Sequence, residues 1–257
     1  MEKNIVIIEK NKTKLEVFKL TANIVPSTTP IATNNPKVLT ILKSTALNFI
    51  CVTVDIIDVG SGNISSIVHC LNRVHVHTRV VNHVEQLSAK VIILPGVGSA
   101  GFFMEQLHKY AFVDAILEHV NSGNKLIGIC LGFQAMTQFM EEDGGVEGLG
   151  LLKARTVALP QAKSHNQWEA IQLNKAELAA KDYQAEFRLT KKRVLSGRAF
   201  YNHKYGVRCD DKRFFNMPIS QDLAPFSAMV VNQQIVGMQF HPEKSQASGL
   251  ALLKMIL

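Results

Sequence analysis

The sequence predicts an α/β protein: a mostly parallel sheet with helices on both faces and an added antiparallel portion. Two observations support this. From residue 52 onward, apolar runs rich in β-branched residues alternate with glycine turns and helical segments, a pattern typical of a parallel sheet covered on both faces. From about residue 150 the extended runs become shorter, and two of them flank turn-like polar pairs, as the strands of hairpins do.

The first two strand–helix units lie between residues 52 and 123. "VTVDIIDVGSGN" (52–63) is an apolar run that ends in glycine turns, and "ISSIVHCLNRV" (64–74) then has helical apolar spacing. "KVIILPGVGSAG" (90–101) is a second strand and turn. We expect one helix over "FFMEQLHKYAFVDAILEHVNSG" (102–123), ending at its final glycine.

A third unit begins at residue 125. "KLIGICLG" (125–132) is a strand and turn, and we expect "FQAMTQFMEED" (133–143) to continue as helix. The later extended runs are predicted strands of a mixed sheet: "TVALP" (156–160), "WEAIQL" (168–173), "FSAMVV" (226–231) and "QIVGMQF" (234–240).

A composition break near residue 51 predicts two parts. Residues 1–51 contain no glycine, and their polar stretch 25–37 resembles a linker. We expect residues 1–51 to be an extension outside the core, dispensable for activity, and residues 52–257 to form the functional domain. Val52 or Val54 would serve as an alternative start if the true start codon lay further downstream.

Charge and cysteine usage exclude several classes of protein. The formal net charge is +7, but more than half of it comes from residues 1–51, and no arginine-rich stripe with interleaved aromatics follows, so we expect no nucleic-acid partner. The four cysteines form no CxxC pair, which argues against a disulfide framework or zinc set and favours a reducing, cytoplasmic setting.

Membrane and metal sites are not expected either. The sequence has no apolar stretch long enough to span a membrane and no signal-peptide pattern. His75 and His77 in "RVHVHTR" are expected on one face of a strand, but no third ligand is evident nearby, so they are interpreted as surface histidines.

The stretch "LIGICLGFQA" (126–135) places Cys130 between Gly128 and Gly132. A reactive residue flanked by glycines, after a strand and before a helix, is typical of a nucleophile elbow, in which small neighbours let the chains pass closely. A helix N-terminus and a nearby imidazolium would both favour the reactive thiolate. The alternative is a buried core cysteine with coincidental glycines.

A cysteine nucleophile needs a base that is distant in sequence and close in space. His241 follows the predicted strand "VGMQF", and Glu243 comes two residues later, so both side chains can point the same way. The carboxylate would then hold the imidazole in one tautomer, as the third member of a catalytic triad does. The alternative is a turn with an ordinary solvated histidine.

The turn "LPGVGSAG" contains a G-x-G-x-x-G pattern, which also occurs in dinucleotide-binding proteins. It lies on the second strand, behind a proline, so a dinucleotide site is the weaker interpretation. In a cysteine hydrolase, backbone N–H groups of Gly96, Val97 and Gly98 would stabilise a tetrahedral oxyanion. The other donor would be the N–H of Leu131, next to the nucleophile.

"PGVG", "GICLGFQ" and "HPEKSQ", in this order, resemble the class I glutamine amidotransferases, and in particular the glutaminase subunits of imidazole glycerol phosphate synthases. "DVGSGN", "EGLGLL", "FYNHKY", "PFSAMV" and "GLALLKMIL" add to the resemblance, which covers about residues 52–257. It implies a flavodoxin-like fold of the amidotransferase type and a glutaminase of histidine biosynthesis, with no metal or organic cofactor.

The resemblance also implies roles. Cys130 would attack the side-chain amide of L-glutamine, His241 would protonate the leaving ammonia, and Gln134 would help to hold the substrate. The ammonia would pass to a separate (βα)8-barrel cyclase in a heterodimer, which makes imidazole glycerol phosphate and aminoimidazole carboxamide ribotide. Lys244 and Trp168 are the candidates for the docking face.

Two segments depart from the family pattern. The chain has "HNQWE" (165–169) where the family usually shows His-Met-Gly-Trp-Asn, and "HKY" (203–205) where it usually shows His-Ser-Tyr. These departures leave two alternatives open. One is the same glutaminase feeding a sugar-modifying amidotransferase of surface polysaccharide synthesis, and the other is a non-catalytic scaffold of the same fold.

Overall fold

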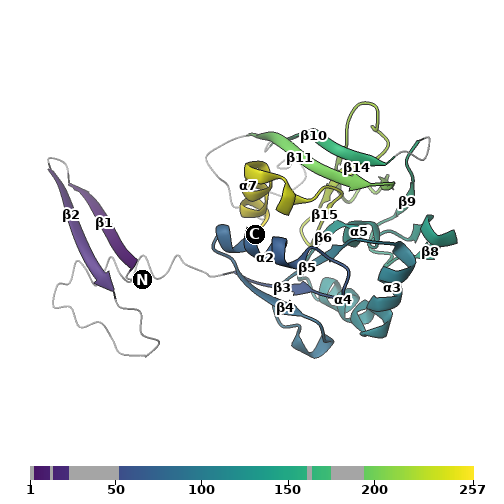
Figure 1. Ribbon diagram of the computed structural model, residues 1–257, viewed down its shortest axis with the longest axis horizontal. Coiled ribbons are helices and arrows are strands. Elements are labelled where there is room, and N and C mark those ends of the chain that lie inside the picture. Colours follow the sequence, from purple (N-terminus) through teal and green to yellow (C-terminus); the bar gives the residue numbers. More distant parts are fainter. Residues whose placement is uncertain (1–2, 12–13, 23–51, 161–163, 175–193) are drawn as a thin grey trace. The chain divides into compact units, whose positions relative to one another are not determined.

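The computed structural model describes residues 3–11, 14–22, 52–160, 164–174 and 194–257 (Figure 1). The chain divides into two compact units, Met1–Ile50 and Cys51–Leu257. The linker expected at 25–37 lies outside the described residues. The first unit contains an antiparallel hairpin of β1 (Lys3–Asn11) and β2 (Lys14–Ala22). That this unit is dispensable for activity stays a prediction.

The second unit is built on a seven-stranded sheet in the order β13-β14-β15-β6-β5-β3-β4. Strands from β15 to β4 run parallel, and β14 and β13 extend one side as antiparallel strands. The parallel part has the flavodoxin-like order, so the predicted fold class is confirmed. The strands are β3 (Thr53–Ile57), β4 (His77–Val81), β5 (Val91–Gly96), β6 (Lys125–Cys130), β13 (Phe215–Pro218), β14 (Ser227–Val231) and β15 (Ile235–Met238).

Helices cover both faces of this sheet. The inner strands β3, β5 and β6 are almost continuously buried, because both of their faces meet a core. One core contains Leu71 of α2 (Ile64–Arg73) and Leu252 of α7 (Gln246–Ile256). The other contains Phe103 of α3 (Ala100–Lys109) and Ile116 of α4 (Phe112–Asn121).

Two smaller sheets carry the antiparallel portion. One has the order β12-β9-β7-β8, and the other pairs β10 with β11 along ten residues each. Their bounds are β7 (Phe139–Met140), β8 (Val146–Glu147), β9 (Ala154–Ala158), β10 (His165–Asn174), β11 (Val194–His203) and β12 (Tyr205–Cys209). Short 3-10 helices lie at Val84–Gln86 (η1), Glu142–Gly144 (η2) and Pro242–Lys244 (η5).

The single helix expected over residues 102–123 is wrong. The segment forms two helices, α3 and α4, separated at Ala111, whose backbone is left-handed with φ 58°. The break changes the direction of the chain, so that Phe103 and Leu107 before it and Phe112 after it are all fully buried. Burial of apolar side chains therefore overrides the continuous helical pattern.

The helix expected over residues 133–143 is also wrong. Only α5 (Leu131–Gln134) forms, and the chain then enters β7. The carbonyl groups after α5 are used by a later segment: Leu149 donates to Ala135, and Leu152 donates to Met136. The Thr137 hydroxyl donates to the Gln134 carbonyl, which is a side-chain alternative to the helical ladder.

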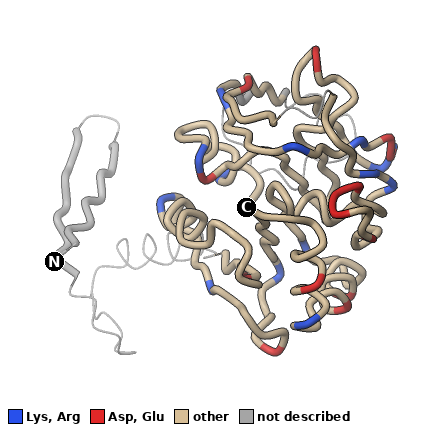
Figure 2. Tube along the Cα trace, turned by 45° about the vertical axis from the view of Figure 1, so that its right-hand side comes forward, with Lys and Arg blue, Asp and Glu red and all other residues tan. Residues whose placement is uncertain are grey.

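The expectation that His75 and His77 share one strand face is wrong as well. β4 begins at His77, and His75 lies before it in a left-handed turn with φ 62°. Basic and acidic residues of the second unit are scattered along the trace in Figure 2. Among the described residues, no helix is long and apolar enough to cross a membrane.

Candidate active site

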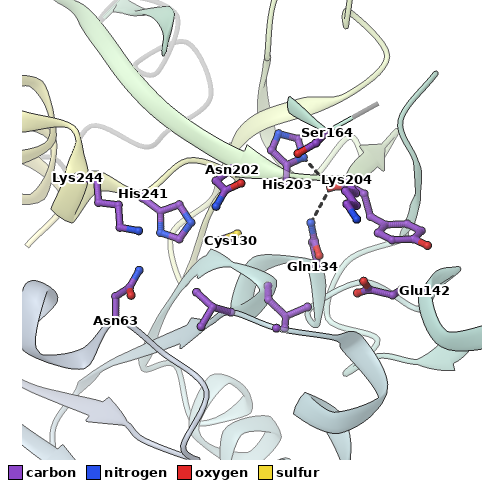
Figure 3. A pocket seen from close by; sticks show the side chains of 14 residues that line it. Asn63, Cys130, Gln134, Glu142, Ser164, Asn202, His203, Lys204, His241 and Lys244 are labelled. Atoms are coloured by element: carbon purple, nitrogen blue, oxygen red, sulfur yellow. Dashed lines mark hydrogen bonds between the residues drawn. The ribbon is translucent and has the colours of Figure 1, made fainter. Parts of the chain in front are cut away.

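The carboxyl ends of β3, β5 and β6 meet at one edge of the sheet, where doubly wound folds bind their ligands. A cavity of about 470 Å³ lies there and is shown in Figure 3. Cys130 lies in the middle of this view, with Lys244 and Asn63 to one side and Lys204 and Glu142 to the other. The described residues that line the cavity are Asn63, Val97, Gly98, Cys130, Leu131, Gln134, Glu142, Ser164, Asn202, His203, Lys204, Tyr205, His241 and Lys244.

Cys130 ends β6 and precedes α5 in a strained turn. Its backbone has φ 54° and ψ −111°, a combination that non-glycine residues rarely adopt. The glycines on both sides allow the close crossing that this turn needs. A Cβ on Gly132 would overlap the Leu94 carbonyl, and a Cβ on Gly128 would lie 2.8 Å from the Phe133 Cα. Because α5 contains only four residues, the helix dipole expected to favour a thiolate is short.

His241 and Glu243 lie just beyond β15, the strand next to β6. The side chains of both are almost fully buried, and His241 Nδ1 lies 2.8 Å from Glu243 Oε1. Asn63 Nδ2 donates to the same carboxylate oxygen at 3.4 Å. The backbone N–H of His241 donates to the Phe200 carbonyl at 2.9 Å, which anchors the loop to β11. The structure thus brings the three predicted triad residues together.

Hydrogen bonding sets the charge of His241. Burial lowers its pKa, but hydrogen bonds to the Cys130 and Glu243 side chains and the negative charges of both outweigh burial and raise the pKa to about 10. His241 is therefore an imidazolium at neutral pH. It can hold a proton for a leaving group next to the Cys130 sulfur.

This pKa makes the stability of the fold depend on pH in the alkaline range. A histidine whose pKa is raised on folding contributes stability that is fully present below about pH 6.5 and is lost as the pH rises to about 10. We expect the difference in free energy of unfolding between the wild type and a His241→Asn variant to decrease as the pH rises from about 6.5 to about 10. Urea titrations at each pH measure this difference.

Cys130→Ala is the control for this pH dependence. It removes one partner of the imidazolium, so the pH dependence should shrink. A difference between wild type and His241→Asn that is constant from pH 6 to 10 would contradict the assigned charge state.

The glycine turn after β5 lies against Cys130, since Gly96 is paired with Cys130 between the two strands. The Val97 N–H donates to the Ser61 carbonyl at 3.0 Å, and the Ser61 hydroxyl donates back to the Val97 carbonyl. Val97 and Gly98 line the cavity, as does Leu131. The Val97 N–H is thus bound to Ser61 in this conformation, which the sequence did not reveal.

Gln134 is buried beneath the cavity. Its Nε2 donates to the Tyr205 carbonyl at 2.8 Å and to Gln239 Oε1 at 3.1 Å. Gln239 in turn directs its Nε2 to the Cys130 sulfur at 3.8 Å. These bonds use both N–H groups of the Gln134 amide, so a ligand in the cavity would meet its carbonyl oxygen.

The two candidates for a docking face both lie close to Phe200. The Lys244 Nζ is 5.9 Å from the centroid of the Phe200 ring, and the Trp168 ring is 5.7 Å from it. Arg198 lies over the other ring, with its guanidinium carbon 6.0 Å from the Trp168 centroid. Lys244 also lines the cavity, so this group of side chains connects the cavity with the surface.

The two segments that depart from the family pattern meet at one end. His165 of β10 pairs in register with His203 of β11, and His165 Nδ1 lies 2.9 Å from His203 Nε2. Glu169 Oε1 lies 3.2 Å from His165 Nε2. Burial, outweighing a hydrogen bond to the Tyr205 carbonyl, lowers the pKa of His203 to about 3, so this ring stays neutral.

Several cavity residues were not predicted from the sequence. Asn63 follows β3 at the sheet edge where ligands bind, so its position after a predicted strand was a usable signal. Glu142 begins η2, and Ser164, Asn202 and Lys204 lie at or next to strand ends, in each case without a motif. The described residues contain no group of three or more His, Cys, Asp or Glu placed to hold a metal ion.

Together, the fold and the site define the class of protein: an α/β enzyme with a cysteine at a strand-to-helix turn and a hydrogen-bonded histidine–glutamate pair beside it. The chain belongs to the class I glutamine amidotransferase family, whose sequence model matches residues 55–255. It is therefore an enzyme of that family.

Two relatives of this chain are subunits of imidazole glycerol phosphate synthases. The imidazole glycerol phosphate synthase subunit HisH of Desulfitobacterium hafniense is 32% identical over 204 residues, covering 78% of this chain and 92% of the relative. The subunit HisH 2 of Methanococcus maripaludis is 31% identical over 205 residues, covering 77% and 96%.

Solved structures agree on the fold. A crystal structure of a glutamine amidotransferase matches with a TM-score of 0.59 at 18% identity, covering 78% of this chain and 96% of that one. The structure of PurLQS from Thermotoga maritima matches with a TM-score of 0.58 at 16% identity, covering 79% and 96%. At these identities the likeness concerns the fold alone.

Proposed function

We propose that the chain hydrolyses L-glutamine with a Cys130–His241–Glu243 triad and supplies the ammonia to a (βα)8-barrel cyclase subunit. The cyclase would make imidazole glycerol phosphate and aminoimidazole carboxamide ribotide in histidine biosynthesis. The observation that carries this proposal is the hydrogen-bonded chain from Cys130 through His241 to Glu243 at the wall of a cavity of about 470 Å³. The HisH relatives support the choice of acceptor.

In the first half-reaction, the Cys130 thiolate attacks the side-chain amide carbon of glutamine and forms a C–S bond. The carbonyl oxygen becomes an oxyanion, which backbone N–H groups at Leu131 and in the Gly96–Gly98 turn would stabilise. His241, held by Glu243, gives its proton to the amide nitrogen. The C–N bond then breaks, ammonia leaves, and a glutamyl thioester remains on Cys130.

In the second half-reaction, water attacks the thioester carbonyl. His241, now neutral, takes a proton from this water, and the C–S bond breaks to release glutamate and restore the thiolate–imidazolium pair. Glu243 keeps the ring in the orientation that both transfers need. No step requires a metal or an organic cofactor.

The cavity also suits the other end of glutamine. Glu142 lines it, and burial raises the pKa of this carboxyl while a hydrogen bond from the Ala100 N–H lowers it. A carboxylate is the natural acceptor for the α-ammonium group of an amino acid. The carbonyl oxygen of Gln134 adds a neutral acceptor nearby.

Docking of the cyclase is proposed to switch the oxyanion turn. While the Val97 N–H is bound to Ser61, it is not directed at the oxyanion, and one missing donor costs about 2.7–4 kcal/mol of transition-state stabilisation. Contact of the partner with Lys244 and Trp168 would select the peptide orientation that faces the substrate, as a shift between two populations.

This coupling gives the test of the proposed function. We expect slow glutamine hydrolysis by the chain alone and a rise of at least tenfold when the cyclase and its ligand are added. We also expect a smaller rise for Gly98→Ala, because Gly98 has φ +104° and a side chain there is strained. Glutamate dehydrogenase-coupled assays measure the glutamate formed, because the ammonia passes to the cyclase.

The matched control for Gly98→Ala is Gly150→Ala. Gly150 also has a positive φ, of +67°, but no atom lies within 4 Å of an added Cβ. Gly96→Ala, also expected to reduce the rise, is less informative, because its Cβ would lie 2.7 Å from the Gly132 nitrogen and displace the elbow itself. Full activity of the lone chain would contradict the coupling and would point to the altered "HNQWE" segment.

A second acceptor remains a candidate because one observation favours it. The two segments that contain the departures meet at His165 of β10 and His203 of β11, and Lys204, one of the departures, lines the cavity. A changed side chain at the cavity is expected if the partner differs. A sugar-modifying amidotransferase of surface polysaccharide synthesis would then replace the cyclase, and identification of the co-purifying subunit separates the two.

A further inference from the structure

We propose that Lys204 binds the α-carboxylate of the substrate and thereby selects a side-chain amide that belongs to a free α-amino acid. This role rests on the proposed glutaminase function and deepens it. Lys204 stands in "HKY" (203–205), one of the two segments that depart from the family pattern described above. Three features of the site carry the inference: the fixed position of Lys204, the charge that faces it, and the place of the second lysine of the cavity.

The backbone around Lys204 is held on both sides. Lys204 connects β11 to β12, and its carbonyl accepts the N–H of Leu159 at 2.9 Å. The next carbonyl, that of Tyr205, accepts from His203 Nδ1 at 2.7 Å and from Gln134 Nε2 at 2.8 Å. The side chain itself is exposed and lines the cavity. The anchored backbone fixes the point from which the flexible Lys204 side chain extends, and binding still costs this side chain its rotamer entropy.

The charge that faces Lys204 is complementary. Glu142 lines the same end of the cavity, and the attraction between the two charges opposes the rise that burial causes in the Glu142 pKa (Figure 3). An α-amino acid carries an ammonium and a carboxylate on one carbon. An acidic and a basic side chain at one end of a pocket match this pair with opposite signs.

The other lysine of the cavity is less suited to this role. Lys244 lies on the far side of Cys130, near Asn63 and His241, with its ammonium over the Phe200 ring (Figure 3). The carboxylate near it, Glu243, is buried and already bonded to His241. Only the end with Lys204 offers both charges. With the reacting amide at Cys130, the α-carbon of glutamine therefore points toward Lys204 and Glu142.

Two substrate analogues separate binding of the α-carboxylate from binding of the α-ammonium group. Glutaramate lacks the α-amino group of glutamine, and 4-aminobutanamide lacks the α-carboxylate. We expect Lys204→Met to raise KM about ten- to hundredfold for glutamine and glutaramate, the range for loss of a bond to a charged group, with kcat changed less. KM for 4-aminobutanamide should be unchanged. Glu142→Gln, which still accepts from Ala100, should show the reverse pattern between the two analogues.

The assay uses the full chain with the cyclase and its ligand, and Lys212→Met, an exposed lysine outside the cavity lining, is the control. Lys204→Arg should keep the preference for carboxylate-bearing substrates. An equal rise in KM for both analogues, or none for glutamine, would overturn the role of Lys204. Wild-type protein that releases no ammonia from glutamine would instead refute the proposed function, so the two failures are distinguishable.

Discussion

Replacing Cys130 with alanine is expected to abolish glutamine-dependent synthesis by the complex and to leave ammonia-dependent synthesis intact. The sulfur forms the only covalent bond to the substrate in the proposed mechanism, so no other group can take its place. Alanine keeps the Cβ at the strained turn of φ 54°, so the elbow should be preserved. Product formation is measured with glutamine and then with ammonium chloride as the nitrogen source.

Cys209→Ala is the matched control for Cys130→Ala. Cys209 is as buried as Cys130 but lies in β12, outside the cavity lining. The Cys209→Ala variant should retain the glutamine-dependent kcat/KM of the wild type. If Cys130→Ala lost synthesis equally with glutamine and with ammonium chloride, Cys130 would have another role, such as support of the interface with the cyclase.

Replacing His241 with asparagine is expected to lower kcat by about 10²–10⁴-fold, the usual value of positioned acid–base catalysis. The ring carries a proton at neutral pH, with its pKa raised to about 10, so it supplies the acid that the leaving ammonia needs. Glu243→Gln should cost less, because Glu243 orients the ring through the 2.8 Å bond and does not transfer a proton to substrate.

His119→Asn is the control for His241→Asn. The His119 ring lies 3.1 Å from the Lys125 carbonyl, at the end of β6 opposite to Cys130. The His119→Asn substitution should therefore leave kcat unchanged. Steady-state glutamate formation with the cyclase and its ligand gives kcat for each variant. A wholly inert Glu243→Gln beside a nearly normal His241→Asn would show that the two roles are assigned wrongly.

The fold and the chemical centre were predictable because they depend on local patterns. Glycines around Cys130 indicate a tight turn whatever the rest of the chain does. His241 and Glu243 also meet, but Glu243 lies in η5, so this short helix and not the expected strand alternation brings the two side chains together. The strands β3, β5 and β6 were predicted from their apolar runs, since buried parallel strands are apolar on both faces.

The rest of the site depends on contacts between distant segments. Glu142 reaches the cavity because the helix after Cys130 ends at Gln134, where the 148–154 segment takes over its carbonyl groups. Lys204 lies there because His203 and Tyr205 fix a turn between two strands. The bond between the Val97 N–H and Ser61 joins the ends of β3 and β5, and no spacing rule encodes it.

Transfer of labelled nitrogen tests the central claim most directly. The chain and the cyclase are supplied with glutamine carrying ¹⁵N in its side-chain amide, together with an excess of unlabelled ammonium, and the imidazole glycerol phosphate is analysed by mass spectrometry. Hydrolysis at Cys130 with direct delivery to the cyclase predicts product that is almost fully labelled. Product labelled only in proportion to the mixed ammonium pool, or no glutamine-dependent product at all, would contradict it.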